Sequence, residues 1–327
     1  MKLRTLSIIT AAAIAAISCK KDKDTPITPS LDGYLTIYGL EEFVTPGQTC
    51  TLKVKGGSHP EGEKLGYYWK TLPSYPKADT LDITENYYIT FTDTLQTCTI
   101  YCNAFAAGYS GLSTMRYATV VEGGKNGSIQ GKGIVFPDPE RPDEVTEKTI
   151  GSQVWTANNL TIKQGKSLPF NNCKAMTDVV GLYYNQSDAA SACAALPGGN
   201  WTLPTREDWN TLITHVKGNL SSDYGMSVTA ALAADATFNG TTMWKFWPEV
   251  NDIMNGSGFS AIPAGYANIT AKSFDGWCSY AAFWTADKAE DNNDLGYCAY
   301  IYWNQPEIFS NTMDAESFGA SVRCIKR

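Results

Sequence analysis

Residues 201–209, Trp-Thr-Leu-Pro-Thr-Arg-Glu-Asp-Trp, decide how the second half of the chain folds. Thr205 precedes the acidic residues Glu207 and Asp208, a pattern that caps the N-terminus of a helix. Beyond the cap, apolar residues recur on one helical face, at Trp209, Leu212, Ile213 and Val216. The stretch therefore predicts an amphipathic helix that begins after Thr205 and ends near Gly218.

Other elements follow from the sequence on both sides of this helix. A shorter helix is predicted from about Asp188 to Ala195, and it carries Cys193. Aromatic and β-branched runs at 259–266, 282–286 and 320–325 predict strands. Helices and strands that mix in this order predict an α+β domain.

Six ordered motifs connect this domain to a known family. They are Ile150–Leu160 (IGSQVWTANNL), Gly181–Asn185 (GLYYN), Trp201–Trp209, Gly258–Tyr266 (GFSAIPAGY), Phe283–Thr285 (FWT) and Ser321–Cys324 (SVRC). The set resembles the Fibrobacter succinogenes major paralogous domain, a family of exported bacterial modules, and it covers residues 149–327. The resemblance implies a C-type-lectin-like fold. Here Cys193 stands further from Trp201 than in the family pattern, which implies a longer turn between helix and strand.

The resemblance also implies disulfides. Domains of this fold join the first helix to the last strand, which pairs Cys193 with Cys324, and often add a second bridge, here Cys278 with Cys298. Cys173 is then left over.

The segment 31–123 has a different pattern, in which short runs of alternating apolar residues are separated by turns. Cys50 lies in an early run, Cys98 and Cys102 in a later one, and Trp69 between them. This order predicts an all-β, immunoglobulin-like sandwich with a bridge beside a buried tryptophan. Cys98 is the expected partner of Cys50, although Cys102 competes with it. The simplest role for this domain is a stalk, and Gly- and Pro-rich stretches predict a linker at 124–148.

The N-terminus predicts export and a lipid anchor. Lys2 and Arg4 precede an apolar run that is too short to span a bilayer, so residues 1–18 form a signal peptide. Ala16-Ile17-Ser18-Cys19 resembles a bacterial lipobox, which makes Cys19 the lipidated residue. Residues 19–30 are charged and Pro-bearing, as expected of a tether. The expected location is the cell envelope, at the outer membrane, with exposure on its outer face as a further expectation.

Composition and charge limit the classes of function that we expect for this chain. The chain has 327 residues, nine of them cysteines, and a net charge of −7 with a pI near 5.0. An acidic chain without a basic stripe is a poor match for nucleic acid. It has two histidines and no nucleotide-binding or nucleophile-elbow motif, so we expect no enzyme and no catalytic residues. The predicted contact with the membrane is the lipid alone, and the sequence leaves the oligomeric state open.

A ligand site is expected in the aromatic region 277–309. Flat rings and polar groups suit a sugar, and the candidate residues are Trp277, Trp303, Asn304 and Glu307. The alternative is that the aromatic residues fill the core, which is expected for Trp284 and Tyr300. Asp287, Asp291 and Asp294 are candidate ligands for calcium, or else part of a solvated acidic loop, and no other cofactor is expected.

Two functions remain from the sequence. One is a surface adhesin or carbohydrate-binding lipoprotein, whose ligand is a glycan or a surface protein. The other is a structural or assembly component of a cell-surface appendage that binds a protein partner.

Overall fold

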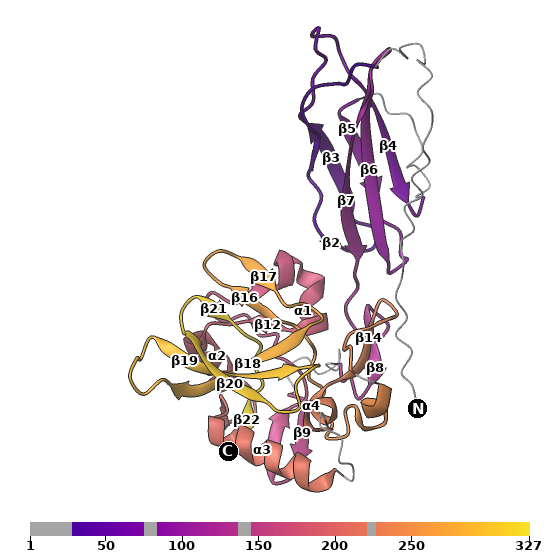
Figure 1. Ribbon diagram of the computed structural model, residues 1–327. Helices are drawn as coiled ribbons and strands as arrows, with labels where there is room; N and C mark the ends of the chain where they lie inside the picture. The colour runs from indigo at the N-terminus through magenta and orange to yellow at the C-terminus, as the bar shows by residue number, and fades with distance from the viewer. Residues whose placement is uncertain (1–27, 75–83, 137–144, 221–226, 247) are drawn as a thin grey trace, which may run out of the picture.

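The computed structural model describes residues 28–74, 84–136, 145–220, 227–246 and 248–327 (Figure 1). The predicted signal peptide, the lipidated Cys19 and the tether as far as residue 27 lie outside these ranges. No helix within them is both long and apolar enough to cross a membrane. The protein is rich in β-strands and has more than one domain.

Two facing sheets build the N-terminal domain. One has the order β1-β3-β5 and the other β2-β7-β6-β4. Their bounds are β1 Thr36–Tyr38, β2 Phe43–Val44, β3 Thr49–Lys55, β4 Gly66–Leu72, β5 Asn86–Thr90, β6 Thr97–Phe105 and β7 Leu112–Val120. Alternate residues of β3 and β6 are buried, as expected for strands with one face on a core. Trp69 of β4 is fully buried and stacks on Tyr87 of β5, with ring centroids 5.3 Å apart.

The predicted Cys50–Cys98 bridge is not formed. Cys50 is a thiol in β3, and Cys102 of β6 is a buried thiol as well. Burial raises the pKa of Cys102 to about 12. The stacked rings of Trp69 and Tyr87 belong to opposite sheets, so aromatic packing fills the interior where a bridge was expected.

The predicted linker contains a strand. β8 (Ile129–Lys132) pairs antiparallel with β14 (Asp235–Phe238), and β9 (Glu147–Ile150) starts before residue 149. Ile129 is 1% exposed and packs with residues of the C-terminal half. Residues 129–132 of the predicted linker therefore belong to the second domain, because pairing with β14 and burial of Ile129 fix their position.

In the part of the chain that the structure describes, short sheets and four α-helices build the C-terminal domain. The central sheet has the order β13-β22-β10-β9, so its neighbours come from both ends of the domain. The strands are β10 Gln153–Thr156, β11 Leu168–Pro169, β12 Leu182–Tyr183, β13 Trp201–Thr202, β15 Thr241–Thr242, β16 Tyr266–Asn268, β17 Ser273–Asp275, β18 Tyr280–Lys288, β19 Leu295–Tyr302, β20 Phe309–Asp314, β21 Phe318–Gly319 and β22 Ile325–Lys326. The helices are α1 Lys174–Val180, α2 Gln186–Ala194, α3 Arg206–Asn219 and α4 Ser227–Leu232, with 3-10 turns at Phe170–Asn172 and Pro248–Ile253.

Both predicted helices are present. α2 begins after its cap Asn185, and α3 begins after Thr205. The Thr205 hydroxyl accepts a hydrogen bond from the Asp208 backbone N–H, and the Asp208 carboxylate accepts one from the Thr205 N–H. This reciprocal pair is a capping box, which satisfies two N–H groups that a helix start leaves open.

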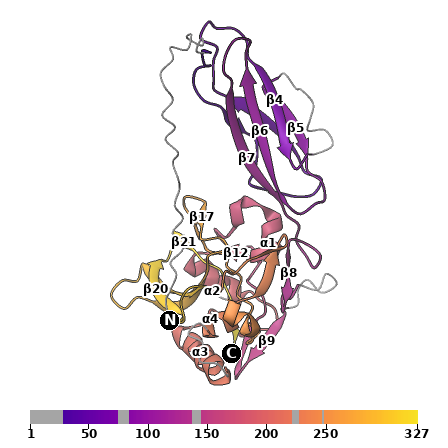
Figure 2. The same ribbon diagram turned by 45° about the vertical axis from the view of Figure 1, so that its right-hand side comes forward.

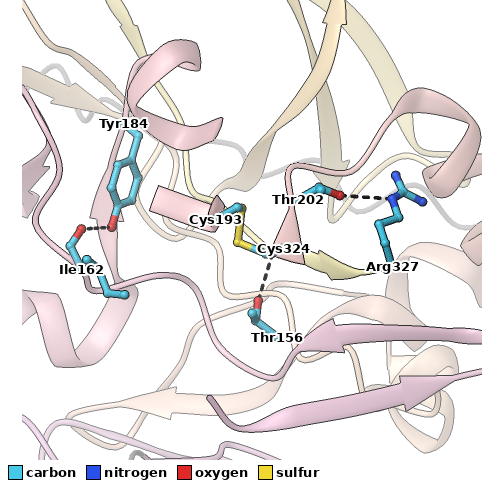
Figure 3. Close-up of a disulfide and its surroundings, with 7 residues drawn as sticks. All are labelled: Thr156, Ile162, Tyr184, Cys193, Thr202, Cys324 and Arg327. Carbon is cyan, nitrogen blue, oxygen red and sulfur yellow. Dashed lines mark hydrogen bonds between the residues drawn. A yellow bond between two sulfur atoms is a disulfide. The ribbon is translucent and has the colours of Figure 1, made fainter. Parts of the chain in front are cut away.

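A disulfide closes the C-terminal domain. Cys193 of α2 is bonded to Cys324, 131 residues later in the chain. Figure 3 shows the bond with its surroundings, where the Thr156 hydroxyl accepts a hydrogen bond from the Cys324 N–H. The second predicted bridge is wrong, because Cys278 and Cys298 are both thiols. Cys298 pairs with Trp284, four residues along β18 from Tyr280. Cys278 lies in the turn before β18 and packs against a different buried cluster from the one that contains Cys298, so the two thiols do not meet.

The two domains share a buried cluster. Phe43 of β2 is 5% exposed and its ring centroid lies 5.4 Å from that of Phe170. The Asn239 side-chain amide donates to the Val120 carbonyl at 2.9 Å, and the Asn171 amide donates to the Glu42 carboxylate at 2.7 Å. Figures 1 and 2 show the sandwich extending as a column from the C-terminal domain. The domains are therefore joined by packed side chains as well as by the chain itself.

Candidate functional site

The candidate site is built on the antiparallel sheet β18-β19-β20. Its register pairs Tyr280 with Tyr302 and Tyr300 with Phe309. Directly paired residues point to the same face of a sheet, and so do residues two apart on one strand. These four aromatic side chains therefore share one face.

The same face is covered at one end and open at the other. Further along the sheet, Trp284 and Cys298 are fully buried against the core that contains α2. At the open end, β16 and β21 add Tyr266 and Phe318, and a groove of about 690 Å³ remains. We call it the tyrosine groove. It is lined by Tyr266, Tyr280, Tyr300, Tyr302, Asn304, Gln305, Phe309, Ser310, Asn311, Met313 and Phe318.

The aromatic rings of the groove form a continuous series, each ring packing against the next. Tyr266 stacks on Phe318 with centroids 5.0 Å apart and lies 6.3 Å from Tyr280. Tyr280 is 5.0 Å from Tyr302, which meets Phe309 edge-on at 6.2 Å. Phe309 is 45% exposed, so the series ends in an open aromatic surface.

Burial moves the pKa of three groove phenols further above neutral pH. It raises the pKa of Tyr280 and of Tyr302 above their ordinary value, since the charged phenolate loses water there. The pKa of Tyr300 rises for the same reason and through its neighbours Cys298 and Tyr302. At neutral pH the groove therefore offers hydroxyl groups and ring faces.

Of the four predicted ligand residues, one lines the groove. Asn304 is exposed at its rim. Trp303 follows Tyr302 and points to the opposite face, where it packs half-buried on the core. The Glu307 carboxylate is exposed and lies 3.7 Å from the Lys217 ammonium of α3.

Trp277 lies elsewhere. Its ring packs against Phe170 and Phe238, with centroids 5.2 and 5.3 Å apart. It belongs to the cluster near the sandwich and does not line the tyrosine groove. The predicted burial of Trp284 and Tyr300 is confirmed, at 0% and 6% exposure.

The predicted calcium ligands do not converge. No group of three or more His, Cys, Asp or Glu residues in the described ranges is placed to hold a metal ion. The Asp287 carboxylate accepts a hydrogen bond of 2.7 Å from the backbone N–H of Arg206, the first residue of α3. Asp287 thus stabilises a helix N-terminus, while Asp291 and Asp294 are exposed.

The sequence prediction missed Tyr266, Tyr280, Phe309, Asn311 and Phe318 as site residues. A local signal existed in β19, because Tyr300 and Tyr302 alternate and so share a face. Tyr266 and Phe318 come from strands distant in sequence, and the pairing of β16 with β21 brings them together. No local pattern predicts that contact.

Fold and groove define a β-rich, multi-domain protein with an aromatic groove in its C-terminal domain. The model of the Fibrobacter succinogenes major domain matches residues 149–326, more than half of the chain, and the protein belongs to this family. A comparison with curated proteins finds no match. Among solved structures, the adhesin InvE of Yersinia pseudotuberculosis aligns at 11% identity, covering 90% of this chain and 70% of that one, with a TM-score of 0.24. An alignment with so low a TM-score gives no information on fold or function.

Proposed function

We propose that this protein is a non-catalytic surface lipoprotein that binds carbohydrate through the tyrosine groove. The observation that carries the proposal is the groove itself, an open hollow of about 690 Å³ lined by aromatic rings with amides and a hydroxyl among them. Sugars present apolar C–H faces and hydroxyl groups, which suit stacking surfaces and amide or hydroxyl partners. In this proposal the domains are an immunoglobulin-like stalk and a C-type-lectin-like head.

The sandwich suits a stalk. Ser30 pairs with Ser110 just before β7, and Val121, just after β7, packs in the cluster shared with the C-terminal domain. The nine residues of β7 span about 30 Å at the usual rise of a strand. The described chain thus enters the sandwich near Ser30, at the end opposite the groove-bearing domain. A lipid on Cys19 would anchor the protein from that end and hold the groove away from the membrane.

The binding proposal is tested with a glycan array. The soluble chain from Lys20 to Arg327 is compared with Tyr302→Ala, which removes a central ring of the groove. Tyr297→Ala is the matched control, because Tyr297 lies on the same strand, faces the opposite side and packs against Arg206. Binding is expected for the wild type and the control and should be clearly weaker in Tyr302→Ala. Equal binding by all three would place the site elsewhere.

The anchor is tested separately. Replacing Cys19 by Ser removes the thiol that would carry the lipid, and we expect the variant to move from the membrane fraction to the soluble one. Protease added to intact cells checks surface display, since an outward-facing chain is cleaved. If Cys19→Ser stays with the membrane, the anchor is not at this residue.

Assembly with a protein partner is the second candidate, and one observation favours it. The outer face of β4-β6-β7 exposes a group of apolar side chains: Leu72 (56%), Phe105 (42%), Met115 (49%) and Tyr117 (51%). Contiguous exposed apolar surface is a feature of interaction sites. Cross-linking on intact cells tests this candidate, with Met115→Glu and Tyr117→Glu expected to abolish any cross-linked product.

A further inference from the structure

Among the residues that the structure describes, the lining of the tyrosine groove contains no Lys, Arg, His, Asp or Glu. A ligand with a carboxylate or sulfate would therefore lose water on entry without gaining an opposite charge, which is costly. The lining is otherwise polar as well as aromatic, with Asn304, Gln305, Ser310 and Asn311 on its rim. The groove thus suits hydroxyl and amide groups better than ions.

The charge that acts on the groove is negative. The Asp275 carboxylate lies close enough to Tyr280 to add to the burial that raises the pKa of Tyr280, and no cation of the described residues is among the causes that shift the pKa of Tyr280, Tyr300 or Tyr302. An anionic sugar would be repelled by Asp275 and attracted by nothing in the lining. The groove also offers no carboxylate to a bridging calcium ion, which requires several oxygen ligands.

Several hydrogen-bonding groups of the groove are open to a ligand. The hydroxyls of Tyr266, Tyr280 and Tyr302 and the side-chain amide of Asn304 make no hydrogen bond to another residue in the described ranges. The side-chain oxygen Oδ1 of Asn311 accepts a hydrogen bond of 2.9 Å from the Thr312 N–H. The side-chain NH₂ group of Asn311 is left as a donor. Amides and hydroxyls both donate and accept, as sugar hydroxyls do.

We propose that the tyrosine groove binds an uncharged pyranose chain, and that it does so without a metal ion. The ring faces stack on the sugar while the phenol hydroxyls and rim amides bond its hydroxyls. A proline-rich peptide also fits aromatic grooves, but its proline residues have no N–H to donate, so the amide oxygens on the rim would lose water without a partner. This inference rests on the proposed carbohydrate-binding function.

Titration calorimetry with defined oligosaccharides tests the inference. The soluble chain is titrated with neutral gluco-, manno- and galacto-oligosaccharides, with oligogalacturonate, and with a proline-rich peptide, each with calcium and with EDTA. We expect a neutral oligosaccharide to bind equally in both buffers. Tyr302→Ala should weaken it about tenfold, corresponding to the loss of one stacked ring, while Tyr297→Ala binds as the wild type does.

The calorimetry distinguishes binding of an uncharged sugar without metal from carbohydrate binding in general. Preferred binding of oligogalacturonate, or loss of binding in EDTA, overturns the inference and leaves carbohydrate binding in place. Binding of the peptide alone, blocked by Tyr302→Ala, overturns both and assigns the groove to a protein ligand. No binding of any probe by a folded wild type, with folding checked by circular dichroism, also counts against both.

Discussion

At the residue scale, Arg323 connects segments that lie far apart in the sequence. It is 1% exposed, and its guanidinium donates to the Thr156 and Ser260 carbonyls at 3.0 and 2.9 Å and to the Asn159 side-chain oxygen at 2.8 Å. Burial lowers its pKa to about 9, so the group is still charged at neutral pH. It is therefore a buried cation held by neutral oxygens.

We expect Arg323→Lys to destabilise the protein by about 2 to 4 kcal/mol. A lysine ammonium cannot reach acceptors on several segments at once, and each buried carbonyl left without a donor costs free energy. Urea unfolding measures the loss, with Arg206→Lys, an exposed arginine, as the control. A loss no larger than that of the control would show that lysine, helped by water, replaces the guanidinium.

Removal of the Cys193–Cys324 disulfide should also destabilise the protein. Cys193 and Cys324 enclose a separation of 131 residues, and constraining so long a loop in the unfolded chain stabilises the fold by about 4 to 5 kcal/mol. We expect the double variant Cys193→Ala, Cys324→Ala to lose most of that amount in thermal unfolding. Cys173→Ala, which removes a half-buried thiol, is the control.

Peptide mapping should recover Cys278 and Cys298 as alkylated thiols after unfolding without reductant, and a Cys278–Cys298 peptide would contradict the structure.

At the element scale, the start of α3 depends on Asp208. Its carboxylate is 12% exposed and lies 2.6 Å from the Arg327 guanidinium. Burial alone would raise its pKa, but hydrogen bonds from Arg327 and Thr205 outweigh this and hold the pKa below the ordinary value of 3.8. A carboxyl with a lowered folded-state pKa stabilises the fold above its unfolded pKa, and that stability is lost as pH falls through the folded value.

We expect Asp208→Asn to cost about 1 to 2 kcal/mol at pH 7, because it removes the ion pair and weakens the cap. The difference from the wild type should be constant from pH 7 to about 5 and shrink below about 4, as the wild-type carboxylate takes up its proton. Unfolding curves across this range measure it, with Glu207→Gln, an exposed residue of the same turn, as the control. A difference that is unchanged at pH 3 would argue against a charged Asp208.

The helices and strands differ in how well the sequence predicts them. α3 was predictable because its cap and its apolar face are local signals between Thr205 and Asn219. The groove was predictable only in part, since Tyr300 and Tyr302 alternate on one strand while Tyr266 and Phe318 meet through strand pairing. Cys278 and Cys298 were paired by resemblance, and the register of β18 and β19 separates them. Local patterns therefore predict elements, and long-range pairing decides which side chains meet.

At the scale of the whole molecule, the position of the groove depends on the joint between the domains. Phe43 from the sandwich lies between Phe170 and Phe238 of the C-terminal domain, and the cluster continues through Val121, Ile129 and Tyr183. A shared buried cluster makes two domains unfold and move together, whereas a flexible linker would let each act alone. The head is therefore expected to keep a fixed direction relative to the stalk.

Phe43→Ala tests that expectation. Removing a buried phenylalanine costs about 3 to 5 kcal/mol, and here the loss falls on the contact between the domains, not on the interior of either one. We expect wild-type calorimetry to show one cooperative transition and the variant to show two, with a larger radius of gyration in small-angle X-ray scattering before unfolding. Tyr88→Ala, which removes a sandwich ring that is 64% exposed, should leave both measurements unchanged. A single transition and an unchanged radius in Phe43→Ala would mean that the remaining contacts between the domains, such as the Asn239–Val120 and Asn171–Glu42 hydrogen bonds, are enough to hold the head in place.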